Sequence, residues 1–318
     1  MPDPTVNTSL RPIQDSAFGY DEARHLLLRA GFGGTPAQIR LLASWGPERA
    51  VDHLLDTSEI EVEAVTEDAF DKDIMRPPTP EEREAARRAR QMQDEETLAQ
   101  LQLRRQRSER EDRRQMVEIR KWWLVRLIES GRPLEEKMTL FWHGHFATSY
   151  RTIENSYHMY MQNQLFRAHA LGNYGELLHD IIRDPAMLQY LNNDRNVASR
   201  PNENLAREIM ELFSLGEGSY TEQDIKEGAR ALTGYTYSDD GFMFNNRVHD
   251  QGSKRILGRS GDMDGDDFCD AILAERACSE FMSWKLYDYF VRHLPEPSRV
   301  DAPTKSVLRQ LAGTFRSS

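Results

Sequence analysis

Two histidines separated by a single residue stand in the stretch LFWHGHFATS, beside a tryptophan and two phenylalanines. His-x-His can form half of a metal site where the backbone bends, because both imidazoles then face one ion. On a continuous helix, side chains two positions apart point about 200° away from each other and cannot share an ion. Gly144 permits a bend, so His143 and His145 are candidate metal ligands. The alternative is a tight bend in a packed core.

A second group of polar side chains lies on the predicted helix 204–215. At about 100° per residue, Asn204, Glu208 and Glu211 fall on one face, and Arg207 lies next to them. The opposite face carries Leu205, Ile209, Leu212 and Phe213. We predict that Glu208 and Glu211 join the histidines around one divalent metal ion such as zinc, manganese or iron, and that Asn204 and Arg207 bind a ligand. Two alternatives stay open: a solvent-facing helix side, and a buried ion-pair network that holds helices together.

His249 and Asp250 follow the segment that is predicted to form strands, and Gly252 and Lys254 come next. An aspartate can fix the tautomer of a neighbouring histidine, and a lysine can bind an anion. His249 and Asp250 are therefore candidate catalytic residues, acting as a base or as further metal ligands. Lys254 and Asn202 are candidate binding residues. The alternative is a loop in which Asp250 caps the next turn.

Other motifs give weaker signals. GFGG follows a helix instead of a strand and lacks the spacing of a dinucleotide-binding loop. GDMDGDDFCD resembles a calcium loop, but Asp267 and Leu273 stand where that loop needs glycine and glutamate. We expect Asp266 to cap a helix over 268–273 instead. The 2 cysteines do not indicate a disulfide framework.

The elements that must position these residues are helical. Within residues 17–56 we predict three short helices, which form the N-terminal helical part of the domain. Glycines end the first helix, Thr35 caps the second with Pro36 in its first turn, and Gly46 with Pro47 separates the second from the third.

Residues 57–121 are predicted to form a charged helical insert. From Thr79 to residue 130 the chain has no proline or glycine after Pro80, and Thr79 is a typical helix cap. Acidic and basic residues nearly balance in the first half of this run, which favours a solvated helix or helical hairpin. The second half is rich in large apolar residues and must be buried.

The main helical domain is predicted over 122–318, with a short helix over 186–191 and a further helix capped by Thr221. Only residues 235–257 look like strand, where SDDG indicates a hairpin turn. The fold class is therefore mostly α: a multi-helix orthogonal bundle with a small β-hairpin and a long charged helical arm.

Composition excludes some functions. The net charge of −11 argues against a general nucleic-acid binder, because binding phosphates needs a basic face. Residues 1–16 lack the features of a signal peptide and are expected to be disordered. No apolar run reaches the roughly 18 residues of a membrane span. The expected protein is soluble and cytoplasmic by default.

Several longer phrases resemble a bacterial family called domain of unknown function 1800. They run in order from about His25 to Leu294: RHLLLRAGFGGTPAQI, LFWHGHFATS, QNQLFRAHALGNYGELL, DPAMLQYLNN, PNENLAREIMELFSLGEGSYTEQDIKEGARALTGY and FNNRVHDQGSKRILG. The resemblance implies a mainly helical fold, and some members of the family are exported. It also implies a companion protein that resembles sulfatases. Because family members continue past LRQLAGTFRSS, we expect the main domain to stop early.

Two hypotheses about function follow. The first is a metal-assisted hydrolase, in which the histidines and Glu208 or Glu211 hold the ion and His249 with Asp250 acts as base. The second is a non-catalytic helical partner or scaffold for the sulfatase-like companion, with the run 79–130 as its interaction arm. Binding of nucleic acid through the arginine-rich run is a third alternative, which the overall acidity opposes.

Overall fold

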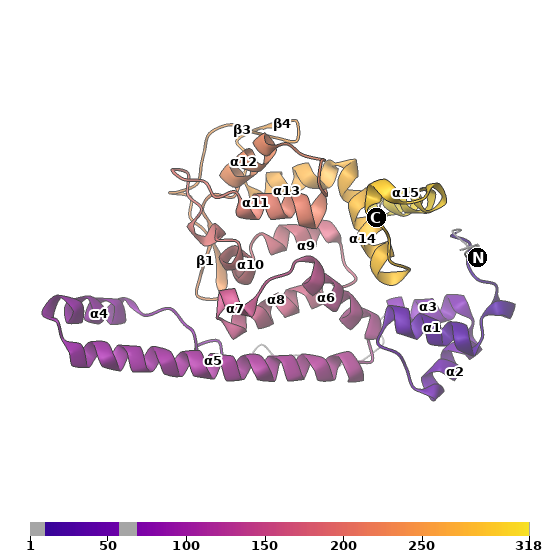
Figure 1. Ribbon diagram of the computed structural model, residues 1–318, viewed down its shortest axis with the longest axis horizontal. Coiled ribbons are helices and arrows are strands. Elements are labelled where there is room, and N and C mark those ends of the chain that lie inside the picture. The colour runs from indigo at the N-terminus through magenta and orange to yellow at the C-terminus, as the bar shows by residue number, and fades with distance from the viewer. Residues whose placement is uncertain (1–9, 57–68, 318) are drawn as a thin grey trace.

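The computed structural model describes residues 10–56 and 69–317. Figure 1 shows a body of packed helices above one long helix, α5 (Glu95–Glu129), which runs along the lower edge of the view. The first three helices lie beyond one end of α5, and α4 (Pro80–Met92) lies beside its other end. The predicted disordered segment 1–16 falls largely outside the described residues, and Asp15–Ala17 forms a short 3-10 helix, η1.

The first three helices are α1 (Tyr20–Ala30), α2 (Pro36–Trp45) and α3 (Pro47–Leu55), as predicted for this part of the chain. The hydroxyl of Thr35 accepts a hydrogen bond from the first turn of α2 at 3.3 Å. Gly46 separates α2 from α3 with φ 80°, a conformation that favours glycine. Their shared core consists of Ala23, Leu27, Ile39, Leu42, Ala50 and Leu54.

Helices α4 and α5 form the helical hairpin that the charged sequence favours. Thr79 caps α4, as predicted. The chain reverses at Gln93, which adopts a left-handed conformation with φ 53°, and Asp94 then caps α5. The first half of α5 is largely exposed, whereas Met116 and Ile119 in its second half are buried against helix α8 (Ser156–Ala168). The change from polar to apolar sequence therefore marks where the arm joins the body.

A buried carboxylate holds three helices together. Glu136, in α6 (Pro133–His145), has a side chain with 0% exposure. Its oxygens accept hydrogen bonds from Arg126 of α5 at 3.0 Å and from Arg167 of α8 at 2.8 and 3.0 Å. The indole of Trp123 donates a further bond at 3.2 Å. Burial alone would raise the pKa of Glu136, but the hydrogen bonds and charges of the two arginines hold it below its usual range.

The body contains one main apolar core, to which most of the later helices contribute. After α8 the elements are α9 (Tyr174–Ile181), α10 (Pro185–Tyr190), η3 (Asn193–Arg195), α11 (Asn204–Glu208), η4 (Ile209–Ser214), α12 (Glu222–Ala231), α13 (Gly265–Ala274), α14 (Arg276–Phe290), η5 (Pro297–Arg299) and α15 (Ala302–Ser317). A short helix, α7 (Tyr150–Ile153), precedes α8. The predicted cap at Thr221 is confirmed, and Asp184 caps α10. The cap of α13 is Asp264, so the prediction of Asp266 was wrong by two residues.

Two small β-hairpins complete the fold. Strand β1 (Tyr235–Ser238) pairs with β2 (Gly241–Phe244), which confirms the predicted hairpin. A second hairpin pairs β3 (Lys254–Ile256) with β4 (Arg259–Gly261) and was not predicted. Its strands are too short to show alternation, and Leu257 occupies a turn position with φ 48°, where a branched residue is rare. The mostly helical fold class with a charged arm is confirmed.

Residues 10–56 and 69–317 contain no helix that combines the length and the apolar character required to cross a membrane.

The ion cluster around Glu136 predicts a large effect of a single substitution. Replacing this carboxylate in Glu136→Gln removes the charge that both arginines share, so the free energy of unfolding should fall by roughly 3 kcal/mol. Urea denaturation at pH 7 measures this change. The control is Glu118→Gln, whose side chain is exposed and pairs only with Lys121; it should cost less than about 0.5 kcal/mol. Equal costs for the two variants would contradict a clamping role for Glu136.

Candidate functional site

His143 belongs to the polar network that surrounds Glu136. Its Nε2 accepts a hydrogen bond from the amide of Asn163 at 2.9 Å. The oxygen of the same amide accepts from Arg167 at 2.8 Å, which fixes the amide with its nitrogen towards the imidazole. Burial and the charge of Arg167 lower the pKa of His143 to about 4. His143 is therefore a neutral hydrogen-bond acceptor inside a structural network.

His145 points elsewhere. It is 7% exposed, and its Nε2 donates to the backbone oxygen of Phe213 at 2.8 Å. Burial lowers the pKa of His145 to about 3, although the bond to Phe213 opposes the shift. Helix α6 continues through Gly144 to His145, so the bend that a shared ion requires is not formed.

The four predicted metal ligands do not form one site. His143 and His145 bind different neighbours on separate sides of a continuous helix. Within residues 10–56 and 69–317, no group of three or more His, Cys, Asp or Glu side chains is arranged to hold a metal ion. The prediction that these histidines hold one ion jointly with Glu208 and Glu211 is therefore corrected. Both histidines instead form hydrogen bonds to neighbouring helices.

Helix 204–215 changes its geometry halfway. Residues 204–208 form a regular α-helix, but Ile209–Ser214 form a π-helix, in which the N–H of Leu215 bonds to the oxygen of Met210 at 2.8 Å. The wider turn shifts the later side chains around the axis. Leu212, expected in the core, is 48% exposed for this reason, whereas Phe213 is buried. The oxygen of Phe213, in the last turn of this helix, has no helical partner and accepts bonds from His145 and from Tyr174.

The polar stripe on this helix is engaged by neighbouring residues. Arg207 binds both oxygens of Glu222 on α12 at 2.8 Å and Glu203 at 2.9 Å. Glu211 accepts a hydrogen bond from the hydroxyl of Tyr220 at 2.6 Å. Burial and the nearby charge of Glu211 raise the pKa of Glu208. Asn204 is exposed. The stripe thus joins α11 to α12 through ion pairs at the surface. This resembles the ion-pair network that the sequence left open as an alternative, except that the network is not buried.

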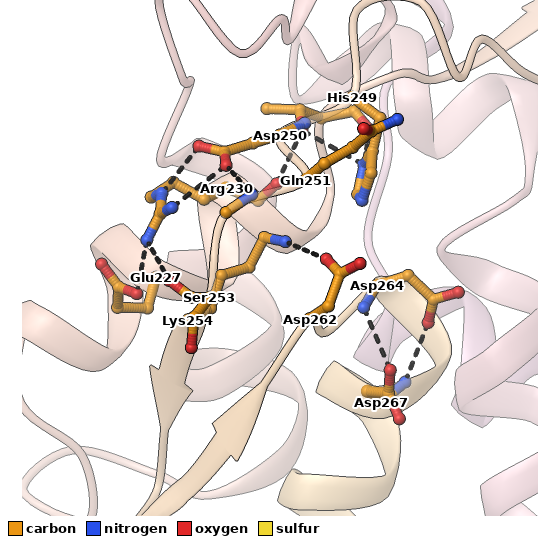
Figure 2. Close-up of polar contacts among 12 residues, drawn as sticks. Glu227, Arg230, His249, Asp250, Gln251, Ser253, Lys254, Asp262, Asp264 and Asp267 are labelled. Atoms are coloured by element: carbon orange, nitrogen blue, oxygen red, sulfur yellow. Dashed lines mark hydrogen bonds and ion pairs between the residues drawn. The ribbon is translucent and has the colours of Figure 1, made fainter.

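His249 and Asp250 do not form a dyad. Figure 2 shows Asp250 paired with Arg230, at 2.7 and 3.0 Å, instead of with the imidazole. The hydrogen bond from Arg230 lowers the pKa of Asp250. A Cβ on Gly252 would lie 2.7 Å from a terminal nitrogen of Arg230 and 3.0 Å from an oxygen of Asp250, so a larger residue there would have to displace this ion pair. Asp250 therefore fastens its loop to α12, where Arg230 also binds Glu227.

His249 keeps one ring nitrogen available. Its Nδ1 lies 2.7 Å from the backbone oxygen of Thr233. A carbonyl can only accept, so Nδ1 carries the proton and Nε2 keeps its lone pair in the neutral ring. Among the described residues, no hydrogen bond occupies Nε2. His249 is thus oriented as a base would be, by a carbonyl and not by Asp250.

Lys254 is a buried lysine with an exposed partner. Its side chain has 0% exposure, and its Nζ lies 3.5 Å from Asp262, whose side chain is 69% exposed (Figure 2). The charge of Lys254 contributes to lowering the pKa of Asp250. Full burial makes Lys254 a support for the loop rather than a surface that a ligand reaches.

A cleft opens at the loop between α10 and α11. It has a volume of about 530 Å³ and is lined by Asn192, Arg195, Arg200, Pro201, Asn202 and Glu203. The predicted binding residue Asn202 lines it directly. The other lining residues, including both arginines, were not predicted, because nothing in their local sequence shows which side of the loop they face.

Buried asparagines brace this loop. Asn193 donates to the backbone oxygen of Leu232 at 3.1 Å, and Asn196 donates to that of Ala229 at 2.9 Å. The oxygen of Asn196 accepts from the N–H of Asn202 at 2.9 Å. Asn193 and Asn196 are 1% and 2% exposed. Since these amides are bonded on both sides, the loop is held rigidly on α12.

The structure thus brings some predicted residues together and separates others. The N–H of Ala198, in the cleft loop, donates to the oxygen of Val248 at 2.8 Å, one residue before His249. Asn202 and His249 consequently lie in adjacent loops, and Arg207 follows on α11. His143 and His145 belong to a different part of the molecule, on α6. Sequence reasoning found one loop of the cleft but missed its arginines.

Fold and site together define a mostly helical protein with a braced polar cleft. The family model described as "Protein of unknown function (DUF1800)" matches residues 25–318, so the chain belongs to this family. Neither a curated protein nor a solved structure matches the chain.

The depressed pKa of His143 predicts how stability changes with pH. A folded-state pKa of about 4 against about 6.5 in the unfolded chain gives stability that is fully present above pH 6.5 and is lost as the pH falls towards 4. In His143→Gln the acceptor is kept and the titration removed. The loss in unfolding free energy between pH 7 and pH 5 should therefore shrink by about 2 kcal/mol, measured by urea denaturation. The exposed His25→Gln variant is the control and should retain the wild-type loss; a variant at position 143 that behaves like it would refute the assignment.

Proposed function

We propose that this chain is a ligand-binding protein whose site is the polar cleft at loop 192–203. The cleft itself carries the proposal: about 530 Å³ lies within the range of ligand pockets, and five of its six lining residues are polar or charged. Loops that bear binding residues are usually held by a rigid scaffold, and the asparagine brace supplies that rigidity here. Preorganisation lowers the entropy lost on binding.

Hydrolysis of the bound molecule is the finer part of this proposal. His249 supports it, because its Nε2 keeps a lone pair while Thr233 orients the ring. The backbone bond from Ala198 to Val248, one residue before His249, supports a position of His249 near the cleft loop. In this scheme His249 activates water as a general base. The predicted metal assistance has no group of ligands among the described residues to support it.

The cleft is tested by changing Asn202. Its side chain accepts from the N–H of Asn204 at 3.0 Å and donates to the backbone oxygen of Asn192 at 3.2 Å. Asn202→Ala removes both bonds, each worth about 1 kcal/mol, and should weaken ligand binding roughly tenfold while the protein stays folded. The probes are sugars, sugar phosphates and amino acids, and the measurement is the shift of backbone amide NMR signals of residues 192–203.

The matched control is Asn246→Ala, which changes an exposed asparagine with one long contact to Gln251. It should bind the probes like the wild type. Probes that perturb other surfaces but leave the signals of residues 192–203 in place would contradict the proposal.

A second candidate function is that of a non-catalytic partner or scaffold for a sulfatase-like companion protein. One observation favours it: the second half of α5 exposes a stripe of apolar side chains on the face that does not meet the body. The stripe consists of Val117, Leu124, Val125 and Ile128, with exposures of 45, 57, 51 and 72%. Contiguous exposed apolar residues often mark interaction sites.

This candidate predicts that charge on the stripe disrupts a complex. Val125→Asp should reduce co-purification of the sulfatase-like companion at least tenfold, because burying an unpaired carboxylate opposes apolar docking. Leu103→Asp is the control, since Leu103 is 52% exposed on the same helix but lies in its arm half. Co-purification that survives Val125→Asp, or that is absent in the wild type, would count against the scaffold function.

A further inference from the structure

We propose that the ligand of the cleft is a small phosphate monoester, whose dianionic group is bound by Arg195 and Arg200. This inference rests on the proposed function and names the class of ligand. Both side chains line the cleft and come from one loop, on either side of the braced Asn196.

The two guanidinium groups have spare donors. Among the described residues, Arg200 forms no side-chain hydrogen bond or ion pair. Arg195 is 86% exposed, and its one ion pair, with Asp194, is long at 3.5 Å. A guanidinium group has five N–H donors in a fork that matches phosphate oxygens, so most of this capacity is unused.

The acidic residue of the cleft does not neutralise these arginines. Glu203 also lines the cleft, but it accepts from Arg207 at 2.9 Å. Arg207 is in turn bound through both of its terminal nitrogens to Glu222. The carboxylate of Glu203 is therefore paired with Arg207 and not with Arg195 or Arg200. In a chain whose net charge is −11, Arg200 thus has no acidic partner among the described residues, and Arg195 has only the long ion pair with Asp194.

Charge and size together favour a phosphate monoester. A phosphate monoester carries about −1.5 to −2 charges at pH 7, which matches two arginines better than a single carboxylate does. The volume of about 530 Å³ exceeds what a bare ion fills and leaves room for an organic group. Pro201 and the amides of Asn192 and Asn202 line the remaining wall, which suits a polar, uncharged body such as a sugar.

Three probes that share one scaffold test the inference: glucose 6-phosphate, glucuronate and glucose. Each is titrated into the full chain while backbone amide NMR signals of residues 192–203 report binding. We expect glucose 6-phosphate to bind at least tenfold more tightly than glucuronate, and glucose to bind most weakly. Raising the salt concentration should weaken the phosphate ester most, because exposed charges are screened.

Variants assign the effect to the arginines. Arg195→Gln and Arg200→Gln should each weaken binding of glucose 6-phosphate about tenfold, since each removes charge-assisted hydrogen bonds. Arg259→Gln is the control, because Arg259 is exposed on β4 and lies outside the cleft. Amide signals outside residues 192–203 verify that every variant stays folded.

The outcomes separate this inference from the proposed function. If glucose binds in the cleft as tightly as glucose 6-phosphate, the cleft takes polar ligands but the phosphate assignment is overturned. If glucose 6-phosphate leaves residues 192–203 unchanged above millimolar concentrations, the phosphate assignment fails, and binding of another probe there would still uphold the cleft. If glucose 6-phosphate binds tightly to the wild type and to Arg259→Gln but not to Arg195→Gln or Arg200→Gln, the result supports both the phosphate assignment and the proposed function.

Discussion

The side chain of Glu136 has no contact with solvent, and the arrangement of three helices depends on how its charge is satisfied. Arg126 approaches it from α5 and Arg167 from α8, so a single carboxylate fixes the arm and two body helices relative to each other. Removing two charges from water is costly, and the cost is recovered only when several hydrogen bonds are made at once. The network continues from Arg167 through Asn163 to His143, which consequently must stay neutral.

A second constraint begins at the other end of α6. His145 reaches the oxygen of Phe213, which has no helical partner because it lies in the last turn of its helix. The bonds from His145 and Tyr174 satisfy this carbonyl within the protein, as a buried backbone group requires. The two histidines of the HGH motif therefore join α6 to two different neighbours. Their spacing of two residues is what allows one helix to face both sides.

Local signals in the sequence were sufficient for most of the fold. The caps at Thr35, Thr79 and Thr221, each followed three residues later by a polar side chain, give the starts of helices because the capping bonds are local. The polar and apolar halves of the run 79–130 likewise predict the arm and its junction with the body. The second hairpin escaped because its three-residue strands and its turn through Leu257 carry no typical local pattern.

The site depended on information that no local pattern holds. The residue types of 209–214 do not signal the π-helix that this segment forms, so the expected stripe was rotated beyond Glu208. Asp250 was predicted to serve His249, yet Arg230, twenty residues earlier in the chain, binds it instead. Arg195 and Arg200 could be recognised only once their loop was known to be braced by Asn193 and Asn196 with both guanidinium groups outward.

The arginines of the helical body are paired with carboxylates, whereas Arg200 in the cleft is not paired among the described residues. Arg126, Arg167 and Arg230 each meet a carboxylate within 3.0 Å, as the stability of a folded chain requires of partly buried charge. An acidic chain has ample carboxylates to pair every arginine, yet Arg200 meets none among the described residues. In the proposed function, the rigid loop keeps the charge of Arg200 available for a ligand, because a preorganised group loses less entropy on binding.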